Sequence, residues 1–101
     1  MDWYSYTNSR IEILIGERLK QRRLEYNITQ EELAKRTGIS RVSISKIERG
    51  LGMNLSSLIQ VMRGLNILEN IQHLIPEPEI SPIEIIKLKN KAKKKRASSK
   101  K

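Results

Sequence analysis

The chain has 101 residues, of which 31% are charged, and a formal net charge of +9. This length allows one small domain with a tail, and a core of that size gains stability from dimerisation. The absence of Cys excludes a disulfide framework and a thiolate metal site. No apolar run approaches the ~20 residues of a membrane span, and the start lacks signal-peptide features, so we predict a cytoplasmic protein with no membrane partner.

The positive charge is concentrated at the C-terminal end. Residues 1–86 contain 11 Lys+Arg and 11 Asp+Glu, whereas residues 87–101 contain nine Lys+Arg and no acid. The body is therefore formally neutral, and its net charge gives no argument for nucleic-acid binding. A DNA-binding body needs a patterned face instead.

Residues 1–8 form an aromatic arm. Trp3, Tyr4 and Tyr6 are three of the four aromatic residues of the chain. Two interpretations stay open, because amphipathic aromatic side chains favour interfaces. The arm either folds onto its own core or docks on a dimer mate or another protein.

A first helix is predicted to begin near residues 7–9 and to end near residues 25–27. Its apolar residues recur at helical spacing along one stripe. Gly16 lies within this helix and costs about 1 kcal/mol relative to Ala. Close approach of another helix would explain it. The stripe consists of Ile11, Leu14, Ile15 and Leu19.

The most informative segment is residues 28–50, which predicts two short helices joined by a tight turn at Gly38. Thr29 and Glu32 match a capping box at the start of the first of these helices. Gly38 supplies the left-handed residue that ends it, and Ser40 caps the helix that follows. A short helix that buries one side and offers donors on the other fits a DNA major groove.

The remaining residues predict two more helices and an extension. Asn54 caps a fourth helix, Asn66 closes it in a left-handed conformation, and a short fifth helix stops at Pro76. Residues 76–86 are expected to form a Pro-containing linker, and a short strand within 80–88 is possible.

The basic tail, residues 87–101, is predicted to be disordered because a block of like charges repels itself. It is expected to contact the DNA backbone or minor groove. A solubilising tail and a protein-binding tail are the alternatives. The predicted DNA contacts are Lys93, Lys94, Lys95 and Arg96.

Four motifs together resemble the Cro/C1-type (XRE) helix-turn-helix family. They are Ile-Gly-Glu-Arg-Leu-Lys-Gln-Arg-Arg (15–23), Thr-Gln-Glu-Glu-Leu-Ala (29–34), Thr-Gly-Ile-Ser (37–40) and Ile-Ser-Lys-Ile-Glu-Arg-Gly (44–50). The resemblance covers residues 15–75. It implies an all-α fold, a five-helix lambda-repressor-like domain over residues 9–75, in which the third helix reads bases. It also implies a homodimer that binds a palindromic operator as a transcriptional repressor.

The same resemblance implies which residues contact DNA. Arg41 suits guanine O6 and N7, whereas Val42 replaces a commoner polar residue and either meets a thymine methyl or merely packs. Arg23 and Glu48 match a positional ion pair of the family. The expected base contacts are Arg41, Val42, Ser45 and Lys46, and the expected phosphate contacts are Thr29, Gln30, Ser43, Arg49 and Asn54.

A finer resemblance concerns the two ends of the chain. The start Met-Asp-Trp and the segment from Pro76 to Lys89, followed by the basic tail, are similar to HipB-like antitoxins. This implies autoregulation of a toxin–antitoxin operon at the bacterial nucleoid and binding of a HipA-like kinase toxin. A regulator without a toxin, of phage type or stand-alone, and an antitoxin that mainly sequesters its toxin are the alternatives.

Catalysis is not expected. The sequence has no nucleophile–base constellation and no phosphate-cradling glycine loop, and His73 is the single histidine. An enzyme and an RNA-binding or coactivator protein with the same fold are the weakest alternatives. We therefore predict a protein that uses no cofactor and no metal.

Overall fold

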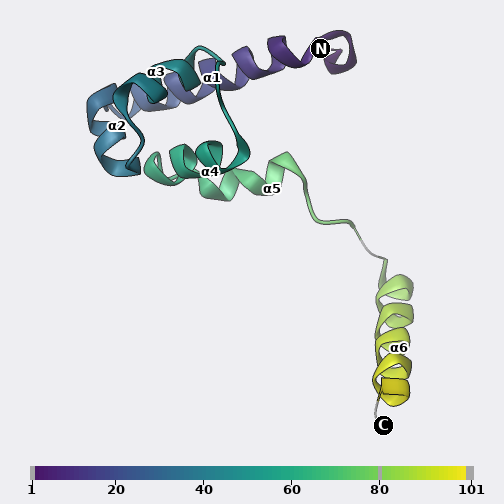
Figure 1. Ribbon diagram of the computed structural model, residues 1–101. Helices are drawn as coiled ribbons and strands as arrows, with labels where there is room; N and C mark the ends of the chain where they lie inside the picture. The colour runs from purple at the N-terminus through teal and green to yellow at the C-terminus, as the bar shows by residue number, and fades with distance from the viewer. Residues whose placement is uncertain (1, 80, 100–101) are drawn as a thin grey trace. The chain divides into compact units, whose positions relative to one another are not determined.

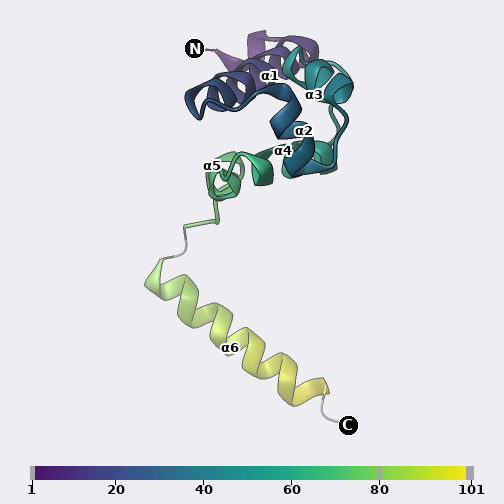
Figure 2. The same cartoon turned by 90° about the vertical axis from the view of Figure 1, so that its left-hand side faces the viewer.

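The computed structural model describes residues 2–79 and 81–99, with side chains up to residue 92 in the last helix. Every regular element in the described part of the chain is a helix (Figures 1 and 2). The chain divides into two compact units, Met1–Asn70 and Ile71–Lys101. The fold class is all-α, and the first unit fits a lambda-repressor-like domain.

The first unit begins with the short 3-10 helix η1 and ends with the 3-10 helix η2. Its elements are η1 (Trp3–Ser5), α1 (Asn8–Glu25), α2 (Gln30–Thr37), α3 (Arg41–Glu48), α4 (Leu55–Gly64) and η2 (Leu68–Asn70). The second unit contains α5 (Ile71–Leu74) and α6 (Pro82–Ser99). No helix of the described residues is long and apolar enough to cross a membrane.

The core lies where α2, α3 and α4 meet. The most deeply buried side chains come from these three helices and the residue that follows α4: Leu33, Ile44, Val61 and Leu65. α2 packs against both α3 and α4, and α3 packs against α1. Burying one such aliphatic side chain contributes about 1.5–3 kcal/mol, so these contacts fix the orientation of α3.

Helices α1 and α3 approach each other closely at two glycines. A Cβ added to Gly16 would lie 2.5 Å from the Ile47 carbonyl oxygen. A Cβ added to Gly50, which follows α3, would lie 2.6 Å from the Cα of Ile13. The close helix approach that Gly16 suggests is thus present, and Figure 1 shows α3 lying along α1.

The aromatic arm folds back on α1. The Trp3 and Tyr6 rings meet edge to face with centroids 5.9 Å apart. The Arg18 guanidinium lies 5.6 Å from the Trp3 ring centroid, a cation–π contact. The arm therefore covers part of α1 rather than entering the core, and Tyr4 remains fully exposed.

The C-terminal segment differs from the expectation of a linker and a disordered tail. Helix α6 begins at Pro82. Residues 82–88, for which a short strand was considered, are therefore helical. The Ser81 hydroxyl accepts a hydrogen bond from the Glu84 amide, and the Glu84 carboxylate accepts one from the Ser81 amide, both at 3.2 Å. This is a capping box with Pro at the first helical position, where Pro is favourable because its missing N–H would be unpaired anyway.

Candidate nucleic-acid interface

Helix α3 is held by its start and by its inner face. The Ser40 hydroxyl accepts a hydrogen bond from the Ser43 amide at 3.1 Å, which caps the helix. Ile44 and Ile47 are almost fully buried on the inner face. The helix therefore has a fixed axis and a fixed rotation, which a helix needs if its outer side chains are to meet particular bases.

The outer face of α3 presents polar and cationic side chains in one stripe. At 100° per residue, its members fall within an arc of about 140°. Val42, in the same stripe, is 60% exposed. The stripe consists of Arg41, Val42, Ser45, Lys46 and Arg49, of which Ser45 is half-buried and the others are exposed. The structure thus brings all four predicted base-contacting residues onto one side of one helix.

The turn between α2 and α3 is pinned by Thr37 and Gly38. Gly38 has φ 73°, so a residue without a Cβ suits the position. The Thr37 hydroxyl donates to the Leu33 carbonyl at 2.8 Å and accepts from the Ile39 amide at 3.2 Å. From α4, the Gln60 amide donates to the Thr37 carbonyl at 3.1 Å. The angle between the two helices is therefore set by contacts on both sides of the turn.

A buried ion pair ties α1 to α3. The Arg23 guanidinium donates to Glu48 Oε2 at 2.6 Å and to Oε1 at 3.0 Å, and the two side chains are 8% and 4% exposed. Its third hydrogen bond goes to the Ile28 carbonyl at 2.8 Å, just before α2. Such a fork-shaped pair fixes orientation because both donors must align with both oxygens. The predicted positional pair is thus formed in this structure.

Gln30, a predicted phosphate contact, belongs to the same network. Its side-chain Nε2 donates to Glu48 Oε1 at 3.0 Å, and the side chain is half-buried. The amide at the start of α2 is therefore oriented by the last residue of α3. The second N–H of this amide has no hydrogen-bond partner among the described residues.

The other candidate phosphate contacts lie at helix ends. Ser43 accepts a hydrogen bond from the Ser40 hydroxyl at 2.9 Å, and Arg49 donates to the Ser45 carbonyl at 3.3 Å. Thr29 caps α2 and Asn54 caps α4, at 3.0 and 2.7 Å. The Thr29 hydroxyl also donates to Glu32 at 3.2 Å, so the free donors at this helix start are backbone amides and the second N–H of Gln30.

The predicted tail contacts lie in α6. Lys93, Lys94, Lys95 and Arg96 belong to the helix, and their side chains are outside the described residues. Among the residues the structure describes, no group of three or more His, Cys, Asp or Glu side chains could hold a metal ion.

Two features of the site were not predicted from the sequence. They are the Gln30–Glu48 hydrogen bond and the bond from Arg23 to the Ile28 carbonyl. The first joins α2 to α3, and the second joins α1 to the loop before α2; no sequence pattern used above encodes either. The capping box at Ser81 and Glu84 did have a signal, the Ser-Pro-x-Glu motif, which the Pro content of the segment obscured.

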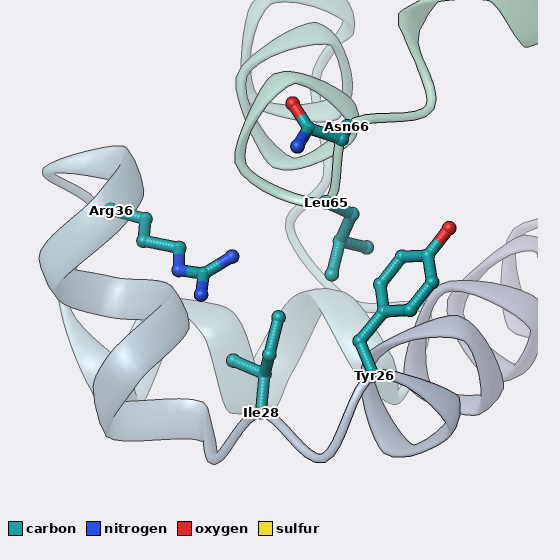
Figure 3. A pocket seen from close by; sticks show the side chains of 5 residues that line it. All are labelled: Tyr26, Ile28, Arg36, Leu65 and Asn66. Carbon is teal, nitrogen blue, oxygen red and sulfur yellow. The ribbon is translucent and has the colours of Figure 1, made fainter.

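A pocket of about 350 Å³ lies elsewhere on the first unit, at the ends of α1, α2 and α4 (Figure 3). Ile28 and Leu65 give it apolar walls, and Arg36 extends from α2 toward them. Tyr26 and Asn66 complete the lining. None of these residues belongs to α3, so the pocket is separate from the stripe described above.

A helix whose outer face is polar, following a left-handed glycine turn and a capped partner helix, defines a helix-turn-helix domain. Comparison with known proteins agrees with this class: the model of the helix-turn-helix family matches residues 19–68. The chain belongs to this family of DNA-binding domains, in its Cro/C1-type (XRE) branch.

A relative from Pyrococcus furiosus, provisionally named an HTH-type transcriptional regulatory protein, is 32% identical over 74 residues. The match covers 73% of this chain and 21% of the relative. The chain thus corresponds to about a fifth of the length of that protein.

Proposed function

We propose that the protein is a sequence-specific transcriptional repressor that binds a palindromic operator as a homodimer. One observation carries the proposal: the exposed stripe of α3, backed by a buried inner face and a buried ion pair. The family match and the name of the Pyrococcus furiosus relative support a role in transcription. Repression follows from occupancy of a promoter.

Base reading is assigned to the four side chains predicted for it, Arg41, Val42, Ser45 and Lys46, and a particular base partner is assigned to three of them. Arg41 at the start of α3 donates to guanine O6 and N7 as a fork, and Lys46 reaches guanine acceptors one turn further on. Val42 meets a thymine methyl group. The Arg23–Glu48 pair supports this assignment because it holds α3 in one rotation relative to the domain, which base reading in a groove requires.

Phosphate contacts position the domain on the duplex. The start of α2 offers free backbone amides beside the oriented Gln30 side chain, and a helix N-terminus attracts anions. Ser43, Arg49 and Asn54 supply further donors. These contacts add affinity without sequence preference, whereas the stripe supplies the preference.

The proposed homodimer is supported by exposed apolar side chains, and it has the two-fold symmetry that the proposed palindromic operator requires. Leu51 and Leu55, which flank the start of α4, are 51% and 67% exposed. In α5, Leu74 is 59% exposed. Burial of such residues between two copies would stabilise a dimer with recognition helices about 34 Å apart, one turn of duplex.

The test is selection of an operator from random duplexes, followed by binding titrations at increasing salt. We expect a palindromic site and a log–log slope of about −0.9 for each phosphate contact. Removal of residues 87–101 should weaken binding similarly for all sequences and flatten this slope. Failure to prefer any sequence over bulk DNA would falsify the repressor assignment, and a monomer on a single half-site would refute the dimer.

The antitoxin role is a finer proposal. Its support is the sequence of the two ends of the chain, together with the exposed Trp3 and Tyr4 side chains of the arm. A HipA-like kinase toxin would be the partner. Expression of the neighbouring gene product alone should be toxic, and the two proteins should co-purify. A harmless neighbour that does not co-purify would leave a regulator without a toxin.

A further inference from the structure

The described part of helix α6 shows no buried face within its own unit. Every described side chain from Ser81 to Ala92 is exposed, including Ile85 and Leu88. Ile83 and Ile86 lie three residues apart on one side, whereas Ile85 and Leu88 lie three apart on another. The apolar residues therefore form no continuous stripe. A helix without such a stripe owes its stability to its caps and to its charges.

The start of α6 favours the helix. Ser81 and Glu84 form a reciprocal capping box, and Pro82 occupies the first helical position. Glu84 also precedes Lys87 by three residues, which is a favourable spacing for opposite charges on a helix. Helix formation is thus encoded locally at this end.

The remainder of α6 opposes the helix through its charge. Seven of the ten residues from Lys87 to Arg96 are cations, and no acid follows Glu84. Lys87 and Lys91 are separated by one helical turn, and further Lys pairs repeat this spacing. Like charges at this spacing destabilise a helix. An anion that neutralises these lysines removes the repulsion that opposes helix formation.

The spacing of these cations matches a nucleic-acid duplex when the segment is helical. Ten helical residues occupy about 15 Å, so that the seven cations are about 2 Å apart along the axis. Duplex DNA carries one negative charge per about 1.7 Å of its axis. In an extended chain the same residues would span about 33 Å and would carry less than half that charge density.

We propose that α6 is a conditionally stable helix whose partner is the phosphate backbone of duplex DNA, and that DNA binding and helix formation are coupled. The proposal deepens the DNA-binding function above and rests on it. The capping box starts the helix, and the duplex neutralises the repulsion that otherwise limits its length. Commitment to a duplex rather than an acidic protein follows from the DNA-binding role proposed for the first unit of the same chain, together with the match in charge density.

The experiment compares full-length variants that keep the charge and change only the helix. Ala92→Pro breaks the centre of α6, whereas Asn90→Ala favours the helix. The probe is a random-sequence duplex at low ionic strength, with affinity measured by fluorescence anisotropy and helix content by far-UV circular dichroism. Wild-type helix content should rise on addition of the duplex, and Ala92→Pro should lose most of the rise.

Affinity should change in opposite directions in the two variants. We expect Ala92→Pro to weaken binding about tenfold, because a mid-helix proline removes most of the helical population. Asn90→Ala should tighten it about two- to threefold. Neither variant should move the thermal unfolding midpoint of the first unit.

Three results would overturn the proposal. If Ala92→Pro binds like wild type while removal of residues 87–101 weakens binding, the segment binds as an unfolded polycation. If that removal changes nothing, the segment does not contact DNA at all. If polyglutamate induces the helix and the duplex does not, the partner is an acidic protein. Operator selection by the stripe of α3 is independent of all three, so failure of the repressor assignment is distinguished from failure of this proposal.

Discussion

The two units of the chain stabilise their helices by different means. Residues 1–70 contain 11 Lys+Arg and eight Asp+Glu, and their helices bury a shared core behind α3. Residues 71–101 contain nine Lys+Arg and three Asp+Glu, and the described side chains of α6 are all exposed. Packing holds the first set of helices, whereas a cap and the balance of charge govern the last one.

This difference suggests that the two units contribute differently to DNA binding. A read-out surface needs rigidity, and α3 has it from its buried face and the Arg23–Glu48 pair. Attraction to the phosphate backbone needs charge and little geometry. The protein places the first property in the first unit, whose formal net charge is +3, and the second in a separate helix that holds seven cations in ten residues. Variants that break one unit and spare the other therefore test the comparison.

The largest effect is expected from loss of the buried ion pair. Arg23→Ala should lower the free energy of unfolding by about 3–5 kcal/mol, because it leaves the Glu48 carboxylate buried without its partner. The matched control is Arg22→Ala. The Arg22 side chain is 45% exposed, and its Nε lies 3.9 Å from Glu25 Oε2, so it forms only a surface ion pair. That change should cost at most about 0.5 kcal/mol. If urea-induced unfolding gave both variants the same loss of unfolding free energy, the buried pair would not be important to the stability of the first unit.

The contact between α1 and α3 gives the next largest effect. Gly50→Ala combines a φ of 78° with a clash against the Ile13 backbone, and should cost about 3 kcal/mol. Gly52→Ala is the control, because Gly52 also has a positive φ, 64°, but nothing lies within 4 Å of an added Cβ. It should cost about 1 kcal/mol. If thermal unfolding gives the same loss for both, the close approach does not limit the packing.

Much of the first unit could be predicted because its signals are local. Thr29, Ser40 and Asn54 each cap the helix that the sequence assigned to them. Gly38 and Asn66 have the expected positive φ. A cap or a left-handed residue acts within three or four positions along the chain, so its pattern is visible in the sequence.

The features that the sequence did not predict depend on contacts between elements or on a balance between opposing contributions to helix stability. The bond from Gln30 to Glu48 and the stacking of Arg18 on Trp3 join residues far apart in the sequence. For α6, like-charge repulsion predicted disorder, whereas the Ser81 cap favours the helix. A sequence shows both contributions but not which is larger, because the outcome depends on the surrounding anions.

A smaller effect is expected on DNA binding from the stripe of α3. Arg41→Ala should weaken operator binding by about 1–3 kcal/mol and relax specificity at one base pair, without a change in stability. Arg63→Ala removes the same charge from an exposed position on α4 and serves as the control. Competition with single-base operator variants measures the preference. A uniform loss over all sequences would make Arg41 a phosphate contact instead of a base contact.

The smallest effects come from matched caps in the two units, and they separate the units most sharply. Thr29→Ala removes the cap of the packed helix α2 and should lower the free energy of unfolding by about 1 kcal/mol. Ser81→Ala removes the equivalent cap of α6, and the thermal unfolding midpoint of the first unit should not move. Instead, circular dichroism should show less helix. Affinity for non-operator duplexes should fall about two- to fivefold, because the free energy lost with the cap must then be supplied by DNA binding. A lower midpoint of the first unit in Ser81→Ala would mean that α6 is stabilised by packing on that unit, and the contrast between the units would be lost.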